Sequence, residues 1–203
     1  MEVPHLLEPD WLQARPTFAE VQEMCRIIEL EQVELPAAPY SEFLRALRES
    51  HSNGGAYLVA FRVLPNSVFD WYASRNRLVE EDLLDSLLTH KAIRTAVPDL
   101  GIPETKAATG LVMADPFLLD GRLAHRMFHG GAYSETGGDG RLAKLSALGV
   151  CRAMFDLRFG EITVAESFDP WTPWFCNIAW DMTMVIFDRR RRLLWLFAIT
   201  DTD

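Results

Sequence analysis

The sequence has no apolar run approaching the ~20 residues that cross a lipid bilayer, so no transmembrane helix is expected. Its first residues, Met1 to His5, lack the basic segment and the apolar stretch of a secretory signal. Cysteines are few: Cys25, Cys151 and Cys176 are widely spaced and odd in number, which argues against a disulfide framework. These absences predict a cytoplasmic protein without membrane association.

Recognisable catalytic patterns are also missing. Residues 137–140 are rich in glycine and precede an expected helix, but they lack the lysine and the hydroxyl residue of a Walker phosphate-binding loop. No serine lies in a Gly-x-Ser-x-Gly nucleophile elbow. No nucleophile, base and stabilising group occur together. The sequence therefore predicts a protein that is not an enzyme and that needs neither a cofactor nor a metal.

One pattern supports an alternative hypothesis, a metal-dependent hydrolase. His125 and His129 stand four residues apart on an expected helix and can point the same way, which is half of a zinc site. Asp201 and Asp203 can share one face of a strand end and supply carboxylates. Arg126, however, occupies the position of the glutamate that acts as general base in metalloproteases, and its charge repels a metal. Surface histidines at a helix end and a solvated chain terminus explain the same residues.

Negative charge dominates the first quarter of the chain. The net charge is −9, and residues 1–54 contain ten acidic residues but only four arginines. An acidic surface repels the phosphates of nucleic acids and attracts basic partners. Nucleic acid is therefore not an expected partner. The four arginines at 189–192 are interpreted as the charged tip of a hairpin, which protects an apolar sheet from edge-to-edge association.

A helix with an acidic side is predicted near the N-terminus. Thr17 and Glu20 form a capping-box pattern, so a helix is expected to begin there and to continue to about Glu34, before Pro36. A solvated helix face explains a charged side. The alternative is a docking surface for a basic partner, with an apolar centre among acidic groups. Its candidate residues fall on one side of the helix: Glu20, Glu23, Ile27, Glu31 and Glu34.

The C-terminal part predicts an antiparallel β-meander over about residues 162–200. Strands are expected at 162–167 and in three apolar runs between 174 and 200. Residues 57–64 form a further expected strand, whereas 109–114 fit either a strand or the start of a helix. Helices are expected at 42–49, 80–96, 116–129 and 141–158. The predicted fold is α+β, a single globular domain over 1–203, with the preceding α-helices covering one face of the sheet.

Two tryptophans provide a second candidate contact. Trp171 and Trp174 are flanked by Pro170 and Pro173, which stiffen the loop, and tryptophan is a common anchor in protein interfaces. The alternative interpretation is that both side chains close the end of the core.

Four short strings in the C-terminal part resemble those of bacterial immunity proteins from polymorphic toxin systems. They are 130–133 (Gly-Gly-Ala-Tyr), 169–175 (Asp-Pro-Trp-Thr-Pro-Trp-Phe), 178–181 (Ile-Ala-Trp-Asp) and 194–203 (Leu-Trp-Leu-Phe-Ala-Ile-Thr-Asp-Thr-Asp). The resemblance covers about residues 115–203. This chain has Asp181-Met182 where such relatives favour Asp-Gly at a tight turn. The resemblance implies a cytoplasmic protein that binds and neutralises a cognate toxin domain.

The hypothesis drawn from the sequence is therefore an immunity protein with a basic toxin domain as its partner. Residues 1–114 carry no such resemblance and are the expected place for partner specificity. A structural subunit of a larger assembly is a further alternative, and the oligomeric state stays open.

Overall fold

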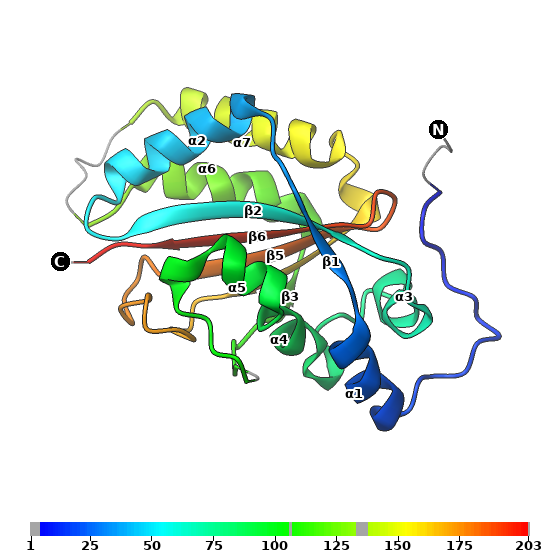
Figure 1. Cartoon of the computed structure of the whole chain (residues 1–203). Helices are drawn as coiled ribbons and strands as arrows, with labels where there is room; N and C mark the ends of the chain where they lie inside the picture. Colours follow the sequence, from blue (N-terminus) through cyan, green and yellow to red (C-terminus); the bar gives the residue numbers. More distant parts are fainter. Residues whose placement is uncertain (1–4, 106, 133–137, 203) are drawn as a thin grey trace.

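The computed structural model describes residues 5–105, 107–132 and 138–202. Over these residues six antiparallel strands form one sheet, in the order β1-β2-β6-β5-β4-β3 (Figure 1). The strands are β1 (Leu30–Val33), β2 (Gly55–Val63), β3 (Val112–Ala114), β4 (Ile162–Ser167), β5 (Met182–Asp188) and β6 (Leu193–Thr200). The α+β class is confirmed, and β4, β5 and β6 form the meander. The strand expected at 57–64 is β2, which pairs with β6.

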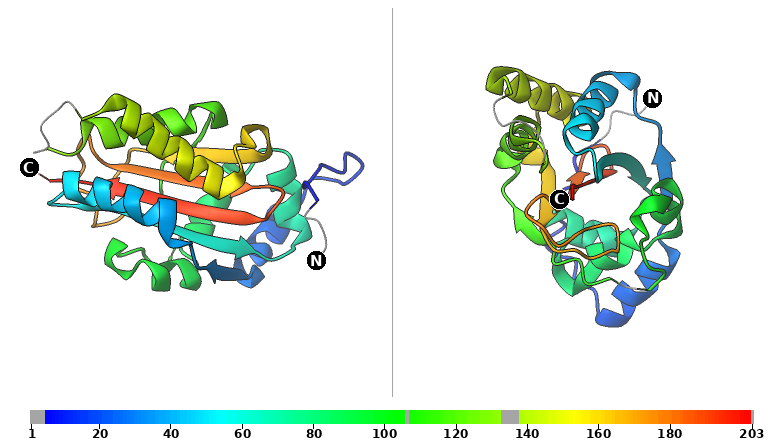
Figure 2. Two further views of the ribbon diagram at one scale, coloured as in Figure 1. Left: turned by 90° about the horizontal axis from the view of Figure 1, so that it is seen from above. Right: turned by 90° about the vertical axis from the view of Figure 1, so that its left-hand side faces the viewer.

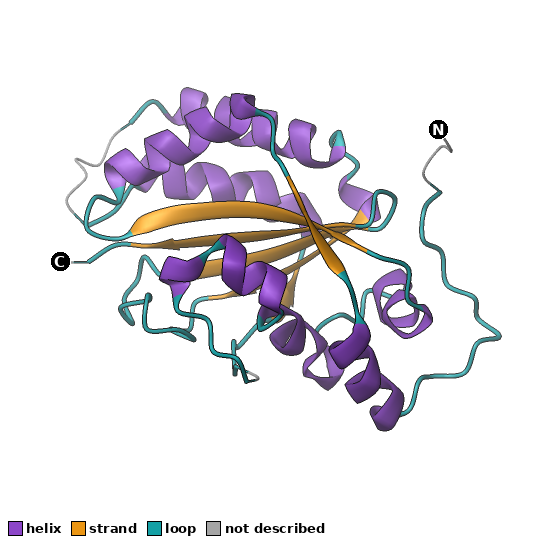
Figure 3. Cartoon of the chain, in the orientation of Figure 1, coloured by secondary structure: helices purple, strands orange, loops and turns teal. Residues whose placement is uncertain are grey.

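Helices cover both faces of this sheet, so the prediction of cover on one face was wrong (Figures 1 and 3). The end-on view in Figure 2 shows the sheet between two helical layers. One layer contains α2 (Ala37–Ser50), α6 (Leu119–His129) and α7 (Gly140–Phe155). The other contains α1 (Phe18–Ile27), α3 (Ser67–Ser74), α4 (Leu83–Leu88) and α5 (Lys91–Ala96). Four 3₁₀ turns complete the described elements: η1 (Glu80–Asp82), η2 (Pro98–Leu100), η3 (Pro116–Leu118) and η4 (Phe159–Glu161).

The central strands divide their side chains between two hydrophobic cores. On β6, Trp195 and Phe197 pack with α2, α6 and α7, whereas Leu194 and Leu196 pack with the helices of the other layer. All seven residues of β5 are buried. Strands that are buried on both faces have nearly continuous apolar runs instead of alternating ones. The apolar run at 193–200 is such a signal.

The first helix ends earlier than predicted. The capping box is present, since the Glu20 carboxylate accepts from the Thr17 N–H and Glu20 N–H donates to the Thr17 hydroxyl. The helix ends at Ile27, and residues 30–33 form β1 instead of a further turn. In β1, Leu30 lies opposite Val63 of β2. This pairing gives hydrogen-bond partners to the backbone N–H and C=O groups on the outer side of β2. The pairing with β2 therefore overrides the local helical pattern of residues 30–33.

Other boundaries differ as well. The helix expected over 80–96 is divided into α4 and α5, because His90 caps the second helix by accepting from the Ala92 N–H at 3.1 Å. The strand expected after Trp174 is a loop that runs to Asp181. On α7, Met154 and Phe155 are buried as expected, whereas Leu142 and Leu145 are exposed and their expected place in the core is taken by smaller residues. The glycine-rich segment 137–140 begins outside the described residues.

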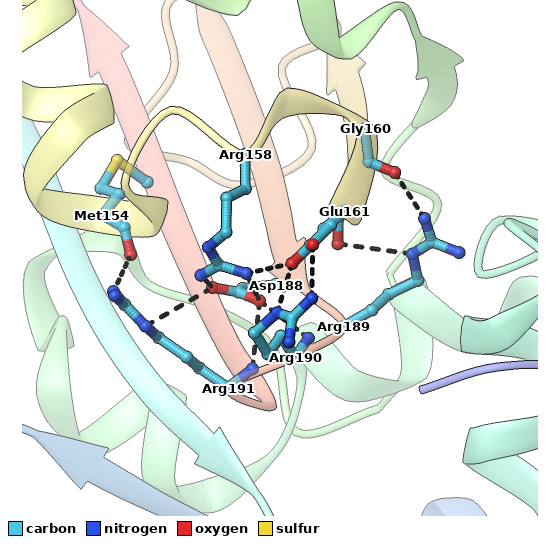
Figure 4. A network of polar contacts seen from close by, with 8 residues as sticks. All are labelled: Met154, Arg158, Gly160, Glu161, Asp188, Arg189, Arg190 and Arg191. Atoms are coloured by element: carbon cyan, nitrogen blue, oxygen red, sulfur yellow. Dashed lines mark hydrogen bonds and ion pairs between the residues drawn. The ribbon is translucent and has the colours of Figure 1, made fainter. Parts of the chain in front are cut away.

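The β5–β6 hairpin is anchored by a network of charged groups (Figure 4). Asp188, which has no exposed surface, forms a salt bridge with Arg158 at 2.6 Å. It also accepts from the backbone N–H groups of Arg190 and Arg191 at 2.8 and 3.0 Å. Glu161 accepts from both Arg158 and Arg190, with the Arg190 contacts at 2.6 and 2.7 Å.

The remaining contacts of the hairpin use backbone carbonyls and the carboxylate of Asp70. Arg191 donates to the carbonyl of Met154 at 3.1 Å. Arg192 donates to the carbonyl of Val63 at 2.9 Å and to Asp70 at 2.7 Å. The predicted hairpin tip is confirmed, since residues 189–192 join β5 to β6. The idea that this charge protects a sheet edge was wrong, because β5 and β6 are central strands and these arginines fix the hairpin to α7 and to the loop after β2.

The first prediction concerns Glu161→Gln. Hydrogen bonds from Arg190 and then Arg158 lower the pKa of Glu161 to about 2. The carboxylate therefore stabilises the fold above its ordinary pKa of 4.5, and this contribution is lost as the pH falls toward 2. We expect the variant to lose about 2 kcal/mol of unfolding free energy at pH 7. The deficit relative to the wild type should shrink between pH 4.5 and 2.

Urea denaturation at several pH values measures this difference. Glu49→Gln is the matched control, because its partner Arg45 is exposed and such pairs contribute about 0.5 kcal/mol or less. A deficit for Glu161→Gln that stays constant down to pH 2 would contradict the assignment.

Candidate partner-binding surface

The predicted acidic surface is divided between two elements. Glu20, Glu23 and Ile27 lie on α1. The carboxylate of Glu20 is used by the helix cap, and the hydrogen bond from the Thr17 backbone is the main cause of its lowered pKa. Glu23 forms an exposed ion pair with Arg26 at 3.6 Å. Ile27 is 57% exposed and lies one helical turn beyond Glu23, so these two residues form a small mixed patch.

Glu31 and Glu34 do not lie on the helix, which corrects the prediction of one continuous stripe. Glu31 lies on β1 opposite Arg62 of β2, and Glu34 follows the end of β1. Both glutamates are exposed. Because β1 is an edge strand, the acidic groups run from α1 along one border of the sheet.

The two loop tryptophans have different surroundings. Trp171 is only 9% exposed, and its indole N–H donates to the Thr183 hydroxyl at 2.8 Å. Trp171 is therefore buried, which favours the alternative interpretation that it closes the end of the core over a contact with a partner. Trp174 is half-buried and packs edge-on against Tyr57, with 5.4 Å between ring centroids. The Tyr57 hydroxyl in turn donates to Asp99 at 2.8 Å.

Asp181 closes the loop that carries these tryptophans. It is 1% exposed, and its carboxylate accepts from the N–H groups of Cys176 and Ile178 and from the Thr200 hydroxyl. Neither Asp181 nor Met182 has a positive φ. This turn therefore does not require the glycine that the resembling proteins favour, because a buried carboxylate holds the loop.

Asp201 is a second buried carboxylate that holds a chain segment in place, here at the end of β6. It is fully buried and accepts from the N–H of Asn53 at 3.0 Å and of Ala132 at 2.8 Å. The Gly131 N–H donates to the Ser50 carbonyl at 3.0 Å. The end of β6, the turn after α2 and the segment after α6 are thereby joined. Asp201 is therefore a buried anchor. Asp203, with which it was paired in the hydrolase hypothesis, lies outside the described residues.

His125 and His129 are neighbours on the exposed side of α6, with ring centroids 4.3 Å apart. Burial, followed by the charges of His129, Arg126 and Arg122, lowers the pKa of His125. Arg126 donates to the Ala179 carbonyl at 3.1 Å. Within the described residues no group of three or more potential metal ligands occurs, and the surroundings of the two histidines are cationic.

An apolar surface at the opposite border of the sheet was not predicted. Strand β3 is the last strand there, and within the described chain no strand pairs with its outer side. Val112 opposes Glu166 of β4, and Met113 opposes Ala165. Five large apolar side chains are exposed on β3, on η3 and just after β4: Val112 (60%), Met113 (39%), Phe117 (67%), Leu118 (54%) and Phe168 (48%). We call these five residues the β3 edge.

Polar side chains lie next to the β3 edge. Arg122 of α6 forms a salt bridge with Glu166 at 3.1 Å, and Arg126 lies 5.9 Å above the ring of Phe168. Phe117 stacks on Phe159, with 5.8 Å between ring centroids. The sequence contained one relevant signal, the short apolar run at 109–114, but its ambiguous pattern did not locate a sheet edge.

Comparisons with family models, with curated proteins and with solved structures find no match for this chain. No helix in the described segments is long and apolar enough to cross a membrane. The function must therefore be inferred from the surfaces of the molecule.

The second prediction tests the Asp201 anchor. A Cβ added at Gly131 would overlap the Asp201 carboxylate and lie 2.7 Å from the Ser50 carbonyl. Gly131→Ala should therefore cost about 2–3 kcal/mol of unfolding free energy, measured by chemical denaturation. Gly149→Ala is the control, because it lies within α7 and its Cβ would meet no atom within 4 Å. The control should gain about 0.5–1 kcal/mol, and equal effects of both variants would contradict the anchor.

Proposed function

We propose that this protein is an immunity protein that binds a cognate toxin domain and neutralises it. The observation that carries the proposal is the β3 edge, where five large apolar side chains are exposed on or near a strand whose outer side has no partner in the described chain. Isolated exposed apolar residues are ordinary, but several of them at one border of a sheet, with polar neighbours, support a protein interaction site. The resemblance of the C-terminal strings indicates which kind of binding protein this is.

The β3 edge suggests how the partner binds. An extended segment of the toxin domain can pair with the outer side of β3, whose N–H and C=O groups supply affinity that does not depend on side chains. Side chains such as Val112, Phe117 and Phe168 then provide apolar anchors. Natural proteins usually protect such an edge with charge or proline, and β3 itself contains neither.

The acidic groups act at a distance in this proposal. The strand order places β1 and β3 at opposite borders of the sheet. A partner bound at β3 therefore does not rest on Glu31, but it feels the field of a chain with net charge −9. Complementary charge mainly raises the association rate, whereas anchors in the interface determine the dissociation rate.

The β3 edge also fits a second candidate function, that of a structural subunit. An unpaired antiparallel strand can pair with the same strand of a second copy. A stable dimer in isolation that is disrupted by Val112→Lys would favour this candidate. A monomer that binds a toxin domain favours the immunity function.

The third prediction tests the β3 edge directly. Val112→Lys and Phe117→Lys should each weaken binding to the toxin domain encoded beside this protein by ~30-fold or more, because each removes an anchor. Both positions are exposed, so the unfolding free energy should change little. Leu142→Lys on α7, 58% exposed, is the matched control. Protection of cells by co-expression and binding by calorimetry are the measurements, and full protection by both β3 variants would exclude this surface.

The fourth prediction concerns the acidic border. Reversing Glu23, Glu31 and Glu34 to lysine should lower the association rate about tenfold at low salt and much less at high salt. The dissociation rate should stay nearly the same. Glu20 is left unchanged because it caps α1. A salt-independent loss, or a change confined to dissociation, would place the acidic groups inside the interface.

A further inference from the structure

A hollow lies between the N-terminal arm and the β5–β6 hairpin. It has a volume of about 780 Å³, within the usual range for small-molecule sites. The arm is held there by the Leu7 N–H, which donates to the Arg189 carbonyl at 3.1 Å. Its lining consists of residues 5–8, Arg62 and residues 189–193. Five arginines thus line one hollow in a chain whose net charge is −9.

The charges of these arginines are only partly balanced. Arg190 is neutralised by Glu161, and Arg192 by Asp70. Arg62 and Arg189 form no salt bridge with any described carboxylate. Their partners are instead backbone carbonyls.

Arg62 donates to the carbonyl of Arg191 at 3.3 Å, and Arg189 donates to that of Gly160 at 2.7 Å. Burial lowers the pKa of Arg189, which shows that its cation is partly desolvated. A partly desolvated guanidinium without a carboxylate partner is stabilised when an anion binds.

We propose that this hollow, which we call the arginine pocket, binds a small phosphorylated molecule. Guanidinium groups bind phosphate oxygens through paired, charge-assisted hydrogen bonds. Leu6, Leu7 and Leu193 offer apolar surface for the organic part of such a ligand. Glu8, at the rim, disfavours a ligand that would extend far along the arm.

A long polyanion is a poor candidate for the same pocket. The acidic groups of residues 1–54 and the overall charge of −9 repel an extended phosphate backbone, whereas a small ligand meets only the local positive field. The arginine pocket does not include any residue of the β3 edge, so this inference is independent of the proposed toxin partner.

The fifth prediction is tested by isothermal titration calorimetry with the full chain. ATP and pyrophosphate are the probes, and adenosine, which has no phosphate, is the neutral counterpart. We expect ATP to bind and adenosine not to bind. Binding of pyrophosphate as well as ATP would assign recognition to the phosphates, whereas binding of ATP alone would mean that the apolar lining contributes.

Arg62→Ala and Arg189→Ala should each weaken ATP binding at least tenfold, as expected for the loss of a charge-assisted contact. Arg62 is exposed, so its variant should keep the unfolding midpoint and test the proposal even if Arg189→Ala is destabilised. Arg45→Ala, on α2 outside the arginine pocket, is the control and should bind as the wild type does. No binding at millimolar ATP, or equal affinity in wild type and Arg62→Ala, would overturn the proposal.

Discussion

The structure depends on the need to bury both faces of β5 and β6. Each strand directs one set of apolar side chains to α2, α6 and α7 and the other set to α1, α3, α4 and α5. At about 25 cal/mol per Å² of apolar surface, leaving either face open would forfeit the gain from burying the side chains on that face. The helical layers therefore come from both halves of the chain. The pairing of β2 with β6 joins residues 55–63 to the C-terminal strand.

Buried carboxylates close the ends of the central strands. Asp181 precedes β5 and Asp188 ends it, while Asp201 follows β6. Each accepts hydrogen bonds from backbone N–H groups, and Asp188 also has a guanidinium partner. A buried carboxylate is costly unless it is hydrogen-bonded in this way. The loops at both ends are thereby fixed, and the two sheet borders are the surfaces that we propose for contact with a partner.

Local signals predicted local features. The capping box at Thr17 located the start of α1, and the apolar runs after residue 160 located β4, β5 and β6. Non-local effects were not predictable in the same way. In the sequence, Glu31 and Glu34 continue the helical pattern of α1, but residues 30–33 pair with β2 and form a strand. Likewise, burial of Trp171 depends on Thr183, which is distant in sequence, and exposure at β3 depends on where the sheet ends.

The strings that carry the resemblance occupy structural positions. Gly131 lies against Asp201, Trp171 is buried against Thr183, and Asp181 closes its loop. The segment 130–133 itself ends outside the described residues. The residues of these strings therefore hold loops and strand ends together, and they carry little information about the partner. Partner recognition is expected where such structural demands are weak, and Val112 and the other residues of the β3 edge meet that condition because they are exposed. Under the proposed function, proteins that share these structural positions can bind different toxins, because Val112, Met113, Phe117 and Leu118 of the β3 edge lie outside the strings.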